Sequence, residues 1–155
     1  MLIPRKATKA ARKKRKTKIL KTLASYKNED GTQKENSIER RVRVLLEDMV
    51  LHFTQEKSFI WSGKKRVFDF YVNDGTMSVA IEIMGTYWHS IHYLEGKQPY
   101  SELSKLQKKN LRNDKFKALM MKELGIPLLT FTEDEVNKNI HYVRERINQF
   151  FNLPV

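Results

Sequence analysis

Two β-rich runs on either side of an Asp-Gly pair constrain the fold of this 155-residue chain more than any other feature. The runs are RVFDFYV (66–72) and MSVAIEI (77–83), and the letters NDG stand between them. A type I′ turn needs positive φ at both central positions, and Asp74-Gly75 is a preferred pair for it. The sequence therefore predicts a β-hairpin with a two-residue turn. The expected cross-strand pairs are Asn73–Thr76, Tyr71–Ser78, Asp69–Ala80 and Val67–Glu82.

Helical and strand signals surround this hairpin. Ser37 is a good N-cap for a helix that runs to about residue 54, and a short strand SFIWS (58–62) follows it. A long helix is expected from Ser101 to Gly125, then a strand at 127–131 and a last helix capped by Thr132 and Glu135. The order αβββαβα predicts an α/β (α+β) fold, with a small mixed β-sheet flanked by helices.

Positive charge is concentrated at the N-terminus. The chain has 30 Lys and Arg against 18 Asp and Glu, a net charge of +12, and residues 1–22 contain no acid. We interpret residues 1–35 as a basic arm and linker, and residues 36–155 as the folded domain. Such an arm can neutralise nucleic-acid phosphates, although a solubilising tail, an expression remnant or a tether to an anionic membrane is the alternative. The arm residues expected to contact DNA are Arg12, Lys13, Lys14, Arg15 and Lys16.

Composition also limits the class of protein. The chain has no cysteine, so a disulfide framework and a thiolate zinc site are excluded, and a reducing, cytoplasmic environment is favoured. No apolar run approaches the length that spans a bilayer, so we expect no membrane partner.

Carboxylates in the hairpin predict a metal site. With the register above, Asp69 and Glu82 are diagonal neighbours on one face of the sheet. Two carboxylates this close repel one another unless a cation lies between them, and hard oxygen ligands suit Mg²⁺. The alternative is a solvated strand face that carries acids without a function. The expected metal ligands are Asp69, Glu82 and the adjacent Ile83.

The segment YWH follows the strand that carries Glu82. His89 could reach the same site, where a histidine can move a proton near neutral pH. Tyr87 and Trp88 are either core anchors or a wedge that stacks on bases. Asp114 lies on the long helix among basic residues, where it either forms a surface ion pair or faces the sheet site. The helix residues expected to bind the DNA backbone are Lys108, Lys109, Arg112 and Lys115.

The phrases FDFYV, IEIMGTYWH and NLRNDKFKALMMKELGIPLLTFTEDEV resemble the very-short-patch repair endonucleases. They also resemble the EDxHD-type homing endonucleases of the PD-(D/E)xK nuclease superfamily. The resemblance covers roughly residues 36–136 and implies a restriction-endonuclease-like fold. It implies that Asp69 and Glu82 bind metal, that His89 activates water or assists the leaving group, and that Asp114 orients His89 or a hydrated metal. Glu39 corresponds to a helix glutamate of the family with a supporting role at the metal.

Two departures from the family narrow the prediction. The structural zinc of the repair enzymes is absent because the chain has no cysteine, and Met84 stands where the superfamily has a lysine. We therefore expect an Mg²⁺-dependent endonuclease acting on double-stranded DNA, with Mn²⁺ able to substitute and no zinc. It would be a homing, phage or mobile-element enzyme of a bacterial or phage-infected cell. The alternatives are a mismatch-directed nicking enzyme and a DNA- or RNA-binding protein that does not cut. Double-strand cleavage would require a homodimer or successive nicks.

Overall fold

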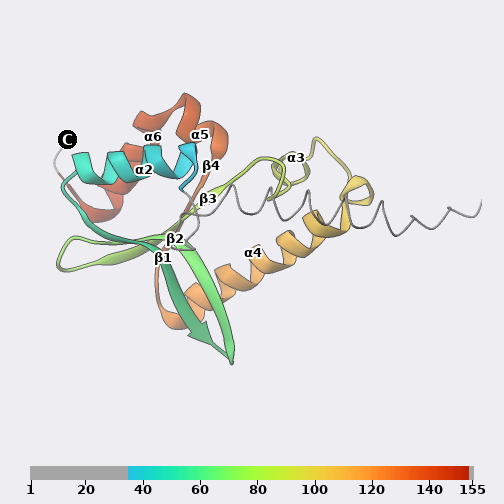
Figure 1. The fold of residues 1–155 in the computed structure, drawn as a ribbon, viewed down its shortest axis with the longest axis horizontal. Coiled ribbons are helices and arrows are strands. Elements are labelled where there is room, and N and C mark those ends of the chain that lie inside the picture. The colour runs from blue at the N-terminus through green and yellow to red at the C-terminus, as the bar shows by residue number, and fades with distance from the viewer. Residues whose placement is uncertain (1–34, 154–155) are drawn as a thin grey trace, which may run out of the picture. The chain divides into compact units, whose positions relative to one another are not determined.

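The computed structural model describes residues 35–153, so the basic-arm residues 12–16 lie outside the described part. The chain divides into two units between Asn36 and Ser37. Figure 1 shows the second unit, in which a sheet separates two groups of helices. Its elements are α2 (Ser37–Asp48), β1 (His52–Trp61), β2 (Lys64–Asn73), β3 (Ser78–Met84), α3 (Ile91–Leu94), the 3₁₀ turn η1 (Tyr100–Glu102), α4 (Lys105–Leu124), β4 (Leu128–Thr132), α5 (Glu133–Lys138) and α6 (Ile140–Phe151).

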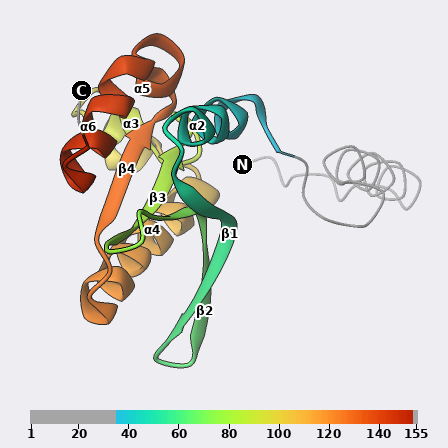
Figure 2. The same ribbon diagram turned by 90° about the vertical axis from the view of Figure 1, so that its left-hand side faces the viewer.

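The sheet has the strand order β1-β2-β3-β4. The first two pairs are antiparallel and β3 pairs with β4 in parallel, because α4 provides the crossover between them. Helices α2, α5 and α6 cover one face, and α4 crosses the other (Figure 2). The predicted α+β class with a small mixed sheet is confirmed.

Each face of the sheet has its own core. The larger core joins the three helices to inward side chains of β2, β3 and β4, among them Phe70, Ile81 and Phe131. The smaller core lies under α4 and contains Phe68, Ala80, Met120 and Met121. Because both faces are covered, the alternative of a solvated strand face around Glu82 is wrong: Glu82 is buried on the α4 side.

The register of the β2–β3 hairpin differs from the prediction. Asn73 pairs with Ser78 and Tyr71 with Ala80, so the loop contains four residues instead of two. Asp74 causes this change, because its carboxylate accepts hydrogen bonds from the backbone N–H groups of Thr76 and Met77, at 2.9 and 2.7 Å. These bonds favour a longer side-chain-stabilised turn over the type I′ turn.

The first helix is shorter than predicted and the first strand is longer. Helix α2 ends at Asp48, and β1 already begins at His52. Phe53 still reaches the larger core, but it does so from the strand, where its ring packs edge-on against Phe70. The apolar spacing of this segment fits a helix and a strand equally well, and pairing with β2 decides the outcome.

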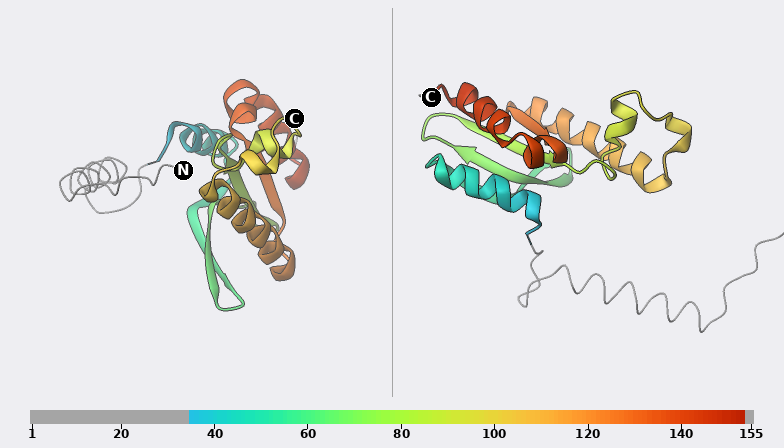
Figure 3. Two further views of the ribbon diagram at one scale, coloured as in Figure 1. Left: turned by 90° about the vertical axis from the view of Figure 1, so that its right-hand side faces the viewer. Right: turned by 90° about the horizontal axis from the view of Figure 1, so that it is seen from above.

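The C-terminal helices also differ in part. The capping box of Thr132 and Glu135 is confirmed, as is Gly125 as the residue that ends α4. The long helix begins at Lys105 with Ser104 as its N-cap, later than predicted. The last helix is broken at Asn139, whose side chain caps the start of α6. Figure 3 shows α3 near the N-terminal end of α4, and η1 directly precedes α4 along the chain.

Candidate active site

The hairpin strands separate at the point where the two predicted metal ligands lie. The ladder between β2 and β3 ends with the pair Phe70–Ile81. Beyond it, the backbone N–H of Ile83 donates to Asp69 Oδ2 at 2.7 Å, and the N–H of Asp69 donates to Glu82 Oε1 at 3.2 Å. Asp69 and Glu82 are therefore directly opposite one another instead of diagonal. Hydrogen bonds from the backbone to these two side chains replace the next backbone pair of the ladder. They hold both carboxylates in the opening between the strands.

The strand β1 is irregular at the same level. Its pairing with β2 omits Glu56, which has a φ of 53° and stands opposite Asp69. Phe68 and Phe70, two residues apart, consequently belong to different cores. Regular alternation along the strand predicts that both rings face the same side. They do not, because a local break in the pleat shifts the side chains on one side of Asp69.

A lysine from α4 neutralises part of this carboxylate pair. Lys117 Nζ lies 2.6 Å from Glu82 Oε1, and the two side chains are only 12% and 8% exposed. The ammonium group also lies 4.6 Å from the centre of the Phe68 ring. Sequence reasoning missed Lys117, although it follows Asp114 by three residues and so lies on the same side of the helix.

Burial raises the pKa of both carboxyl groups. Desolvation and the charge of Asp69 raise the pKa of Glu82 to about 7, although Lys117 opposes the shift. Desolvation also raises the pKa of Asp69, against the hydrogen bond from Ile83 and the charges of Lys117 and His89. A second cation near the pair would therefore stabilise the ionised form of both groups.

His89 and Asp114 form a second pair beside the first. The His89 Nδ1 atom and Asp114 Oδ2 are 2.7 Å apart. Burial lowers the pKa of His89, but the hydrogen bond and charge of Asp114, with the charge of Glu82, raise it above its usual value. Because a carboxylate only accepts hydrogen bonds, Nδ1 carries the proton and Nε2 is left to accept one.

Hydrogen bonds from α4 and α5 hold the segment that carries His89. Gln107 and Asn110 donate to the carbonyl oxygens of Tyr87 and Trp88, each at 3.0 Å. Glu133 Oε2 accepts from the N–H of Thr86 at 3.1 Å. The residues of α4 that contact the site are spaced three or four apart: Gln107, Asn110, Asp114 and Lys117. One side of α4 therefore positions the whole site.

The aromatic pair beside His89 is exposed. Tyr87 and Trp88 are 58% and 53% exposed, and their rings meet edge-to-face at 4.9 Å between centroids. This exposure excludes the interpretation of these residues as core anchors. Two large rings held by a fixed backbone remain accessible to a partner.

The other predicted residues lie at varying places around the site. Ile83 is in it, through the N–H that binds Asp69. Glu39 lies in the first turn of α2, a helix that covers the opposite sheet face from α4, and the role expected for it stays a prediction. Lys109, Arg112 and Lys115 are exposed on α4, and Lys108 lies over the Tyr100 ring at 4.8 Å.

The carboxylate oxygens of Asp69 and Glu82 match the ligands that Mg²⁺ prefers. Residues 35–153 contain no group of three or more His, Asp and Glu side chains arranged to hold a metal. Mg²⁺ is commonly bound by only one or two carboxylates, with water and substrate phosphate completing its shell. Within the described chain, Asp69 Oδ1 and Glu82 Oε2 accept no hydrogen bond, so each carboxylate keeps one oxygen available. The pair fits such a site.

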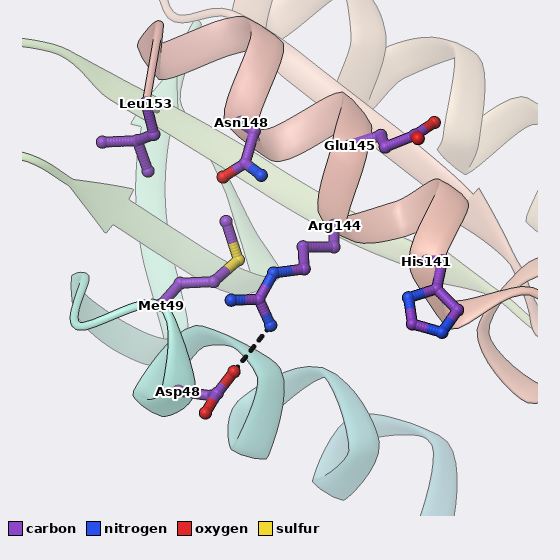
Figure 4. Close-up of a pocket in the computed structure, with 7 residues that line it drawn as sticks. All are labelled: Asp48, Met49, His141, Arg144, Glu145, Asn148 and Leu153. Atoms are coloured by element: carbon purple, nitrogen blue, oxygen red, sulfur yellow. Dashed lines mark hydrogen bonds and ion pairs between the residues drawn. The ribbon is translucent and has the colours of Figure 1, made fainter. Parts of the chain in front are cut away.

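A separate pocket of about 440 Å³ lies between the end of α2 and α6 (Figure 4). Its lining includes Asp48, His141, Arg144 and Glu145, and Arg144 is already paired with Asp48 at 2.6 Å. It holds neither the opposed carboxylates nor the braced imidazole, so we do not place the active site there. No helix in the described residues is long and apolar enough to cross a membrane.

The fold can also be compared with solved protein structures. The chain resembles the solved catalytic domain of the homing endonuclease I-Bth0305I, with 27% identity and a TM-score of 0.50. The match covers 76% of this chain and 95% of the other. No protein-family model and no curated protein matches the chain. The fold is therefore similar to that of a nuclease domain.

Proposed function

We propose that this protein is a divalent-metal-dependent DNA endonuclease that hydrolyses phosphodiester bonds. The observation that carries the proposal is that the Asp69–Glu82 pair and the His89–Asp114 pair lie beside one helix, close enough for His89 to interact electrostatically with both carboxylates. The similarity to a homing endonuclease catalytic domain supports DNA as the substrate.

Asp69 and Glu82 would hold the cation, with Mg²⁺ as the expected ion and Mn²⁺ as a substitute. A cation bound there would polarise the phosphate and stabilise the negative charge that develops on it. Before it binds, Lys117 balances one of the two negative charges and keeps the carboxylates in the low-polarity interior. The backbone N–H of Ile83 fixes the orientation of Asp69.

His89 would move the proton. Its Nδ1–H is held by Asp114 at 2.7 Å, which fixes both the tautomer and the ring orientation. The Nε2 atom, which has no partner in residues 35–153, can take a proton from the attacking water or, once protonated, give one to the leaving oxygen. Tyr87 and Trp88 would stack on bases next to the cleaved bond.

The biological context follows the comparison. The similarity to a homing enzyme favours a homing or mobile-element nuclease over a mismatch-repair enzyme. One site per chain implies a nick by a monomer. A double-strand break would require a homodimer or two successive nicks.

The test is cleavage of supercoiled plasmid and of a randomised duplex library, with Mg²⁺ or Mn²⁺, by the wild type and by Asp69→Asn and His89→Ala. We expect metal-dependent cleavage by the wild type, and a loss of at least about 10²-fold in either variant. His141→Ala is the matched control, because His141 lines the pocket on the other side of the sheet.

Two results would contradict the proposal. One is a wild type that leaves both substrates intact across metals and salt concentrations while it binds them. The other is cleavage that Asp69→Asn and His89→Ala reduce no more than His141→Ala does, because the activity would then come from elsewhere.

A further inference from the structure

A groove with only positive ionic charge lies beside the candidate site, on the neighbouring side of α4. Its volume is about 610 Å³, and its walls come from the start of β2 and from the middle of α4. Four cations line it, Lys64 and Arg66 from the strand and Lys109 and Arg112 from the helix, together with Asn110 and Asn113. No carboxylate contributes to the lining.

The four cations have no acidic partner in the described part of the chain. Within residues 35–153, none of them forms an ion pair, whereas other exposed cations such as Arg144 and Lys138 do. Like charges gathered in a concave surface repel one another and focus a positive potential. An anion bound in the groove would relieve this repulsion and be attracted by the positive potential.

The groove is also organised to present its charges. Arg66 Nε donates to Asn113 Oδ1 at 2.7 Å, and one Nη1–H donates to the carbonyl oxygen of Lys65 at 2.9 Å. The guanidinium group lies 4.6 Å from the centre of the Phe116 ring. These contacts fix one edge of the Arg66 guanidinium group. Its remaining N–H groups can donate two parallel hydrogen bonds to a phosphate.

The aromatic lining indicates which part of a nucleic acid would bind. Phe116 is covered by Arg66 and by the ammonium of Lys64, which lies 5.1 Å from the ring centre, and the ring also packs against Trp61 and the smaller core. The ring therefore supports the cations and is not open to stack on a base. A groove of this kind would recognise phosphates and not base edges.

The spacing of the four cations fits a chain of phosphates better than a single anion. Lys109 and Arg112 are three residues apart on a helix, and so lie about 5–6 Å from each other. Lys64 and Arg66 are two residues apart on a strand, about 6.6 Å by the rise per residue. Asn113, which lines the groove, directly precedes Asp114 of the candidate site. A chain of phosphates in the groove would lead toward that site.

We propose that this groove, formed by Lys64, Arg66, Lys109 and Arg112, binds consecutive phosphates of the DNA backbone next to the cleaved bond. The inference rests on the proposed nuclease function. To the cations expected on α4 it adds Lys64 and Arg66 of β2, and the two sides together define the path of the DNA backbone. Binding in the groove is independent of base sequence.

The experiment measures duplex binding by fluorescence anisotropy between 50 and 300 mM salt, the range being about that over which phosphate contacts change affinity strongly. Full-length Asp69→Asn is the parent, so that the basic N-terminal segment is present and cleavage is blocked. Three substitutions are added to it one at a time: Arg66→Gln, Lys109→Gln and Arg112→Gln. Lys109→Gln and Arg112→Gln are also combined, and two duplexes of unrelated sequence are used. Lys122→Gln is the matched control, because Lys122 is exposed in the last turn of α4 and outside the groove.

Each groove variant should lower the slope of log affinity against log salt by about 0.9, and the Lys109→Gln/Arg112→Gln pair by about 1.8, equally on both duplexes. Lys122→Gln should leave the slope near that of the parent. Thermal midpoints equal to the parent's show that the exposed helix variants keep their fold.

Two outcomes would overturn the inference, and they are distinguishable. If the parent binds and the groove variants change the slope no more than Lys122→Gln, the groove inference fails and the nuclease proposal stands. If the parent binds neither duplex, both fail. A loss confined to one duplex would also contradict the groove, because a phosphate site cannot distinguish base sequences.

Discussion

Replacing Lys117 by Met tests the electrostatics of the candidate site. The change removes the ammonium 2.6 Å from Glu82 Oε1 and keeps most of the side-chain volume over the Phe68 ring. Glu82 would then be a buried carboxylate with Asp69 as its nearest charged neighbour, and that neighbour repels it.

The expected cost depends on pH. At pH 8.5 Glu82 is ionised in the wild type, and removing Lys117 should cost about 3 kcal/mol of the free energy of unfolding, a cost limited by the proton that Glu82 can take up in the variant. At pH 5 Glu82 is protonated even in the wild type, because its pKa is raised to about 7. Only a hydrogen bond is then lost, which costs about 1 kcal/mol. Lys117→Met should therefore destabilise the protein far more at the higher pH.

The assay is urea unfolding of the full chain at both pH values, with equal slopes required of the variants that are compared. Glu82→Gln/Lys117→Met is the control, since it removes both charges and should be within about 1–2 kcal/mol of the wild type at pH 8.5. Two results refute the reasoning. One is an equal cost at pH 5 and pH 8.5, and the other is a double variant as unstable as Lys117→Met.

Three further predictions concern the same site. Between pH 4.5 and about 7 the folded state holds a proton on Glu82 that the unfolded state has lost, so wild-type stability should fall as pH rises, by up to about 3 kcal/mol. Glu82→Gln should remove this fall in urea titrations, and an unchanged slope would contradict the assignment. Asp114→Asn should lower the pKa of His89 in NMR titrations, because burial then acts without its opposing carboxylate; an unaltered pKa would rule out the pairing. Tyr87→Ala and Trp88→Ala should each weaken DNA binding by about 1–3 kcal/mol without lowering the thermal midpoint, and unchanged affinity in both would exclude the wedge.

The prediction that Asp69 and Glu82 lie close together holds even though the predicted register of the hairpin was wrong. The loop is two residues longer than the Asp-Gly signal indicated, because the Asp74 side chain binds the backbone ahead of it. Since side chains alternate with a period of two, a shift of two residues keeps Asp69 and Glu82 on one face. The shift moves them from diagonal to directly opposite positions.

Features that depend on tertiary packing could not be predicted. The side of the sheet on which Phe68 lies depends on the positive φ of Glu56 in β1. The sequence gives no signal for this conformation, such as a glycine. Lys117 lies among many lysines of α4, and only the crossing of that helix over the sheet distinguishes it. The alternatives for Tyr87 and Trp88 were equally compatible with composition, and the structure favours exposure.

The proposed activity requires that Asp69 and Glu82 hold a divalent cation next to His89. Anomalous diffraction from crystals of the wild type and of Asp69→Asn, each grown with Mn²⁺ and a DNA duplex, tests it directly. We expect one strong peak in the wild type, about 2.1 Å from an oxygen of each carboxylate, and no such peak in the variant. A peak that avoids both carboxylates, or an empty site under conditions in which the protein cuts DNA, would contradict it.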